Sequence, residues 1–277
     1  MLSRGTRAML KDLMVHLDES ERTPARLALA ATLSRRHKAR LTGVFGQRAA
    51  ALQVGVVASW PPEEYTHSAE VVRARFEQSA GSLERHEWHD INRGGDAELL
   101  RQIVDCARYG DLMILGQHDE SSHAFVPPEL PEAVVTGAGR PVLIVPYSGT
   151  FPDVGRRPLI AWNGSPEAAR ALNGAIPLIA GCKEAIVLSS NTSYEEAKAA
   201  SVRVEQHLAC HGVAARSSYL IVDEVGVMDS LLNQIADEGA DLLVMGAHGQ
   251  LGLPSYSRGA GTRHILRHMT VPVLMEA

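Results

Sequence analysis

Short apolar runs of strand length alternate along this chain with longer segments of helical spacing. In the first half these are, in order, strand 13–17, helix 24–37, strand 40–45, helix 63–79, strand 84–91, helix 96–107, strand 111–115 and strand 141–145. Pro24 suits the first turn of a helix, because the N–H that proline lacks has no partner there. Strands that alternate with helices favour a parallel α/β sheet over a β-sandwich.

The same pattern starts again in the second half and runs in the same order. The corresponding segments are 13–20 with 157–165, 41–45 with 185–189, 99–103 with 231–235, 111–116 with 241–246, and 140–143 with 271–274. Matches in one order over nearly the full length indicate a tandem duplication. Segment 146–155 is rich in Pro, Gly and Ser, which is typical of a linker. The sequence therefore predicts two α/β domains, 1–148 and 156–277.

Two separated glycine clusters follow the apolar run 241–245 and precede a helical pattern at 262–268. The first holds Gly246 and Gly249, and the second begins at Gly259. Glycine lets the backbone approach an anion closely and adopt positive φ, and the N–H groups that open a helix carry partial positive charge. This segment is a candidate phosphate-binding loop. The alternative is a tight turn that only leads into the next helix.

The glycine spacing and the repeat together resemble a known family. Each half looks like a universal stress protein (UspA) domain, and the chain is similar to the tandem form of that family. The most specific shared part is the motif Gly-x2-Gly-x9-Gly-Ser/Thr, whose glycines are Gly246, Gly249 and Gly259 here. The resemblance implies an open five-stranded parallel sheet in each half, of the adenine nucleotide α-hydrolase type. It also implies ATP, with Mg²⁺, at the carboxyl ends of the strands, the edge at which open α/β sheets generally bind ligands.

The resemblance assigns a nucleotide site in the second half residue by residue. In chain order the implied site residues are Asn163, Met245, Gly246, Gly249, Gly259, Ala260 and Gly261. Met245 and Gly246 would lie beside the ribose and adenine, and the last four would offer backbone N–H groups to the phosphates.

Two of these positions depart from the family pattern. Asn163 stands where many members carry a carboxylate, and its amide can donate as well as accept hydrogen bonds. Ala260 stands in the Ser/Thr position, and Thr262 follows two residues later. Losing that hydroxyl removes one phosphate donor, worth about 1 kcal/mol when exposed and more when buried.

The first half keeps the carboxylate and loses a motif glycine, the reverse of the second half. Asp18 keeps the carboxylate, but Asp119 stands where the second glycine of the motif belongs, and a Pro-rich segment follows it. A carboxylate repels phosphate, and a Cβ blocks close approach of the backbone. We therefore expect a degenerate nucleotide loop in this half, which would serve as a structural partner domain.

Charged and polar side chains near the second glycine cluster are weaker candidates. His248 has no carboxylate or serine nucleophile beside it in the sequence, so we expect a loop histidine that points to solvent. Arg258 and Arg263 could pair with phosphate or could be solvated cations at the helix start. No catalytic residue and no metal-ligating residue is predicted.

The composition excludes some classes of function. The net charge is -5 and no basic stripe is present, which argues against a nucleic-acid surface. No apolar run reaches the ~18 residues of a membrane span, and the N-terminus lacks a secretory signal. We therefore expect a soluble, cytoplasmic protein without a membrane partner.

Three hypotheses for the function follow. The first is a tandem universal stress protein that binds adenine nucleotide as a stress-response or signalling module and is not an enzyme. The second is a weak ATPase, which would need a carboxylate for Mg²⁺ where this chain has Asn163. The third is a nucleotide-free structural or interaction protein. The resemblance implies assembly through the last strands, and an apolar last strand at 271–275 is a liability unless it is covered. The halves are therefore expected to form an intramolecular pseudo-dimer, and a further homodimer is compatible with the sequence.

Overall fold

The structure is a computed structural model that describes residues 9–48, 53–54, 57–58, 61–91, 95–120, 125–191, 193–221, 226–248 and 259–277. The chain contains two compact units. The N-terminal unit is Leu10–Arg140, and the C-terminal unit is made up mainly of Pro141–Ala277. Among the described residues, no helix combines the length and the apolar composition that a bilayer-spanning segment needs.

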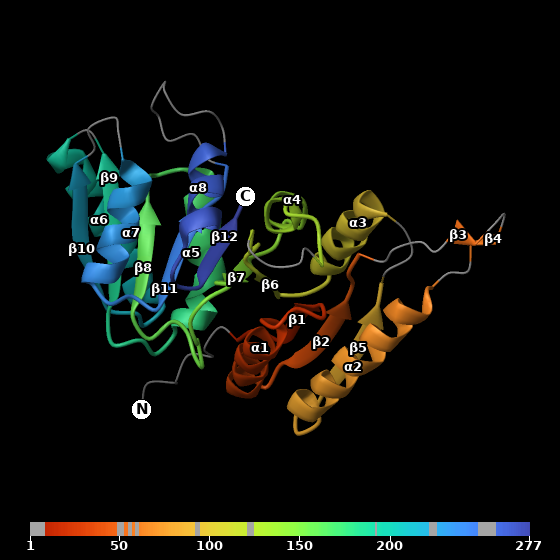
Figure 1. Ribbon diagram of the computed structural model, residues 1–277. Helices are drawn as coiled ribbons and strands as arrows, with labels where there is room; N and C mark the ends of the chain where they lie inside the picture. The colour runs from red at the N-terminus through yellow and green to blue at the C-terminus, as the bar shows by residue number, and fades with distance from the viewer. Residues whose placement is uncertain are drawn as a thin grey trace. The chain divides into compact units, whose positions relative to one another are not determined.

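The N-terminal unit is a parallel sheet whose strands alternate with helices along the chain. Its elements are β1 (Asp12–Leu17), α1 (Thr23–His37), β2 (Arg40–Phe45), β3 (Gln53–Val54), β4 (Val57–Ala58), α2 (Glu63–Ala80), β5 (His86–Asp90), α3 (Asp96–Ala107), β6 (Leu112–Gly116) and α4 (Leu130–Gly137). The strand order is β6-β1-β2-β5, and neighbouring strands are parallel. The short strands β3 and β4 form a separate antiparallel hairpin (Figure 1), which the hydrophobic pattern did not predict.

The C-terminal unit repeats this plan with five parallel strands. Its elements are β7 (Val142–Val145), β8 (Pro158–Trp162), α5 (Pro166–Ile179), β9 (Ala185–Asn191), α6 (Tyr194–Cys210), β10 (Ala215–Ile221), α7 (Val227–Asp237), β11 (Leu242–Gly246), α8 (Ala260–His268) and β12 (Val273–Glu276). The strands β10-β9-β8-β11-β12 are parallel in that order. Strand β7 pairs antiparallel with β12, with Ile144 opposite Val273.

The predicted fold class, two largely parallel α/β sheets flanked by helices, is confirmed. Every strand and helix that the pattern predicts for the first half is present, with bounds that shift by one or two residues. The compact units divide between Arg140 and Pro141, whereas the sequence repeat ends at the linker 146–155. The domain bounds 1–148 and 156–277 follow the repeat and stay a prediction.

Each unit has an aspartate that links the two central strands of its own sheet. Asp111, just before β6, accepts hydrogen bonds from the backbone N–H groups of Lys11 and Asp12 at 2.7 and 3.1 Å. Asp241, just before β11, accepts two at 2.9 Å from the N–H groups of residues 156 and 157. The duplication is therefore visible in hydrogen bonds as well as in sequence.

The central strands bring the sequence-predicted site residues to one edge of the C-terminal sheet. Strands β8 and β11 are neighbours and parallel, with Ile160 opposite Val244. Both strands are mostly buried, as expected for parallel strands that helices cover on both faces. Their carboxyl ends, which lead to Asn163 and Gly246, therefore lie at the same edge.

Candidate functional site

The turn after β8 is built by a pair of side-chain hydrogen bonds. Asn163 Oδ1 accepts from the backbone N–H of Ser165 at 3.1 Å, and Gly164 between them adopts φ 75°. Ser165 then caps α5, because its Oγ accepts from the N–H of Ala168 at 3.1 Å. The carbonyl oxygen of exposed Asn163 is thus engaged by the turn, and its Nδ2 amide is the group that can face a ligand.

The end of β11 lies directly against the start of α5. A Cβ added at Gly246 would come within 2.4 Å of the backbone nitrogen of Ala168 and 2.6 Å of the carbonyl carbon of Glu167. No side chain fits in that space, so glycine is required at this position by packing alone. The preceding Met245 side chain is 7% exposed, which leaves mainly its backbone for any contact with a nucleoside.

The start of α8 supplies the remaining described residues of the predicted site. Gly259 precedes the helix with φ 82°, a left-handed conformation that favours glycine. Ala260 and Gly261 form its first turn, where N–H groups lack intrahelical partners. Helix α8 has no acidic residue in this turn, so the partial positive charge of its N-terminus is not offset by a carboxylate of that turn. Gly249 lies outside the described residues.

The prediction that His248 points to solvent is wrong. Its Nε2 atom is buried, and its ring lies beside Gly259, where an added Cβ would approach Cε1 and Nδ1 to 2.7 Å. The His248 N–H donates to Thr262 Oγ1 at 2.9 Å. Because Thr262 is buried and holds this bond, its hydroxyl is part of the framework and does not simply replace the one missing at Ala260.

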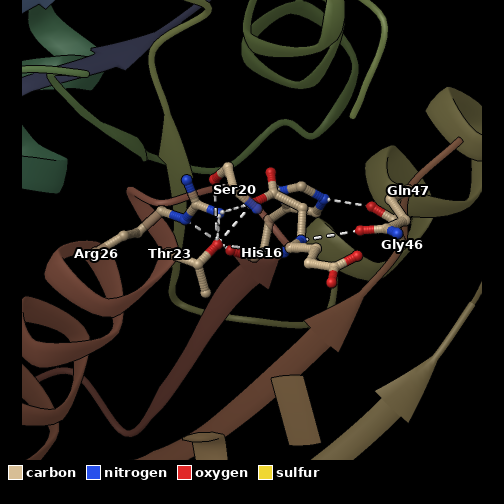
Figure 2. A network of polar contacts seen from close by, with 8 residues as sticks. His16, Ser20, Thr23, Arg26, Gly46 and Gln47 are labelled. Atoms are coloured by element: carbon tan, nitrogen blue, oxygen red, sulfur yellow. Dashed lines mark hydrogen bonds and ion pairs between the residues drawn. The ribbon is translucent and has the colours of Figure 1, made fainter. Parts of the chain in front are cut away.

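The corresponding edge of the N-terminal unit is filled by a buried polar network, shown in Figure 2. Asp18 follows β1 and is 5% exposed. Its Oδ1 accepts from the hydroxyls of Ser20 and Thr23 at 2.5 and 2.6 Å, and from Arg26 Nη2 at 3.2 Å. Arg26 Nε also donates to the carbonyl of His16 at 2.8 Å. The carboxylate that the sequence assigns to a nucleoside is therefore engaged within the protein.

Arg26 occupies the space beside the last residue of β6. A Cβ at Gly116 would come within 2.2 Å of Arg26 Nη1. Gly116 matches Gly246 in the repeat, and Arg26 matches Ala168, since each follows the first-turn proline of its helix by two residues. In the C-terminal unit the backbone of the helix packs against this glycine. In the N-terminal unit a guanidinium group packs against it instead. Sequence reasoning missed Arg26, and only the repeat alignment could have pointed to it.

The same network shifts two pKa values. Burial by itself would raise the pKa of Asp18, but the charge of Arg26, the nearby His16 and the two hydroxyl hydrogen bonds hold it well below its usual value. Burial lowers the pKa of His16 to about 4, against the opposing effect of Asp18 and with a smaller contribution from Arg26. His16 is therefore neutral at pH 7, and its Nε2–H donates to the carbonyl of Gly46 at 2.8 Å.

Comparison with known proteins finds a family match in the second half of the chain. Residues 156–275 match the model of the universal stress protein family. This segment is therefore a universal stress protein domain. No curated protein matches the chain.

Solved structures extend the likeness of fold to both units. A universal stress protein from Archaeoglobus fulgidus DSM 4304 is 17% identical, with 96% of each chain covered and a TM-score of 0.69. A functionally unknown protein from Pseudomonas aeruginosa PAO1 is 16% identical, with 96% of this chain and 92% of that chain covered and a TM-score of 0.57. A universal stress protein in complex with cAMP, 16% identical, covers 51% of this chain at a TM-score of 0.37. The two full-length matches show that the shared fold extends over the whole chain.

Removing Arg26 should strongly destabilise the N-terminal unit. Arg26→Met leaves the Asp18 carboxylate buried without its charge partner, which costs about 3–5 kcal/mol of unfolding free energy. The double variant Asp18→Asn with Arg26→Met removes both charges and should recover much of this loss. Urea denaturation followed by circular dichroism measures both. Arg101→Met, which breaks an exposed pair with Glu98, should leave the midpoint nearly unchanged. Equal losses of unfolding free energy in the single and double variants would show that pairing of the two charges does not contribute to stability.

Acid should destabilise the N-terminal unit well above the pKa of its carboxylates. His16 titrates near 6.5 when unfolded and at about 4 when folded. The unfolded state therefore binds more protons between these values, and stability that is complete above pH 6.5 is lost as the pH falls toward 4. For a fully buried histidine the loss is on the order of 3 kcal/mol. His37, whose pKa burial also lowers to about 4, adds to it.

The check is the unfolding free energy measured between pH 7 and 4.5 for the wild type and for His16→Gln. Glutamine can still donate to the Gly46 carbonyl but does not titrate, so the pH slope of the variant should be shallower. An unchanged slope would mean that His16 is not the titrating group.

Proposed function

We propose that this universal stress protein binds adenine nucleotide, ATP with Mg²⁺, in its C-terminal unit and acts as a non-catalytic, cytoplasmic stress-response or signalling module. The observation that carries the proposal is the edge formed by β8, β11 and α8. There the motif glycine Gly246 packs against the start of α5, and Gly259 immediately precedes the first residue of α8. A helix N-terminus reached through glycines is suited to phosphate.

The proposed contacts follow the family motif. Met245 and Gly246 would contact the nucleoside, and the Nδ2 amide of Asn163 would donate to it. The N–H groups of Gly259, Ala260 and Gly261 would bind the phosphates, together with Gly249 outside the described residues. The phosphates of ATP would supply the negative charge that these donors bind. A higher affinity of ATP for one conformation of the protein would shift the population toward that conformation, and this shift would signal that ATP is present.

Only the C-terminal unit is proposed to bind nucleotide. In the N-terminal unit, Arg26 fills the space beside Gly116 and neutralises Asp18. A ligand there would have to displace a buried ion pair, and an unpaired buried carboxylate is costly. We propose instead that this unit serves as the structural partner of the other.

Charge at position 260 should control nucleotide affinity without harming the fold. Ala260 is the first residue of α8, where an aspartate favours the helix through its dipole but repels phosphate. Ala260→Asp should weaken ATP binding by roughly tenfold or more, while Ala260→Asn, the neutral control, should change it little. Ala260→Ser restores the missing hydroxyl and should tighten binding several-fold, about 1 kcal/mol. Isothermal titration with Mg²⁺·ATP measures all four proteins.

Two further measurements decide between the hypotheses. A ligand at ~100 times its Kd stabilises the folded protein by about 2.7 kcal/mol, so millimolar ATP should raise the melting temperature clearly. If it does not, and denatured protein releases no nucleotide to mass spectrometry, the nucleotide-free interaction protein is favoured. Sustained phosphate release that Ala260→Asp abolishes would favour the ATPase.

A further inference from the structure

His248 follows β11, and it contacts the start of α8, which lies beyond residues 249–258 in the sequence. Its backbone N–H donates to Thr262 Oγ1 at 2.9 Å, and Thr262 is 3% exposed. Its ring lies so close to Gly259 that a Cβ there would come within 2.7 Å of two ring atoms. His248, the second residue after β11, therefore contacts both the residue that precedes α8 and a buried side chain of the first turn of that helix.

The backbone of His248 is in an uncommon conformation. Its φ is 58°, and within the described chain Lys38, at 51°, is the other non-glycine residue with positive φ. Lys38 follows the last turn of α1, where a left-handed residue is common. His248 follows a strand instead. The left-handed conformation is unfavourable for a non-glycine residue, so a histidine is kept there only where its surroundings hold it.

We propose that His248 is a positioning residue for the phosphates of the bound nucleotide, an inference that rests on the proposed function. Its ring and its N–H fix Gly259 and the first turn of α8 relative to the end of β11. The N–H groups of Ala260 and Gly261 are then held in place before the ligand arrives, and donors that are already ordered lose less conformational entropy on binding.

His248 would affect the contacts to the phosphates and not those to the nucleoside. The nucleoside is assigned to Met245 and Gly246, which the strand pairing of β11 holds independently of His248. Loss of the histidine ring should therefore weaken the contacts to phosphate and leave those to the nucleoside intact. A general loosening of the fold would weaken both.

The experiment compares the affinities for Mg²⁺·ATP and for adenosine in the wild type and in His248→Gly. Glycine adopts positive φ without strain, so the variant removes the ring while relieving the backbone. ATP affinity should fall by about tenfold, as when a hydrogen bond to a charged group is weakened, and adenosine affinity should stay the same. Lys38→Gly makes the same substitution at the other positive-φ residue and should change neither affinity.

Thr262→Val gives an independent test through the second contact. Valine keeps the volume of threonine and removes the acceptor of the His248 N–H, so the same selective loss of ATP affinity is expected. An unchanged ratio of ATP to adenosine affinity in both variants would overturn the positioning role, as would equal losses for both ligands. Failure of the wild type to bind either ligand would overturn the proposed function itself, and the inference with it.

Discussion

The close contact at the end of one central strand determines what each unit can do. Gly246 on β11 and Gly116 on β6 hold matching places in the repeat. A Cβ at Gly246 would overlap helix backbone, and one at Gly116 would overlap the end of the Arg26 side chain. At Gly246 the neighbour is the backbone that begins α5, so the edge of the sheet is formed by main-chain groups. At Gly116 the neighbour is the Arg26 guanidinium. One side chain on α1 therefore changes a candidate binding edge into part of a protein core.

Charge explains why the filled edge is stable. Arg26 and Asp18 are both nearly fully buried, and each is held by several hydrogen bonds in addition to their mutual attraction. A buried pair of this kind gains little compared with an apolar core, but breaking it leaves a charge that water cannot reach. Burial keeps His16 neutral by lowering its pKa, with a smaller contribution from the charge of Arg26 and against the opposing effect of Asp18. The stability of the N-terminal unit is thereby linked to pH.

At the candidate site, the described residues form a framework more than a set of reactive groups. Asn163 and Ser165 build the turn into α5, and His248 and Thr262 hold the start of α8. These side chains use hydrogen bonds on the protein itself, so the described donors left for a ligand are the backbone N–H groups at the start of α8 and the Nδ2 amide of Asn163. Donors at a helix N-terminus are suited to an anion.

The sequence by itself determined the repeat, the family likeness and most strands and helices, although not β3, β4 or α4, because these features depend on local periodicity and on spacing along the chain. It also located the departures at Asn163, Ala260 and Asp119. Only the tertiary structure decided the position of the His248 ring, the Arg26 contact with Gly116 and the pairing of β7 with β12. Each of these joins residues that are distant along the chain, or depends on the direction of one side chain. Hydrophobic patterns carry no information about such contacts, since burial and partner are set only when the strands and helices pack.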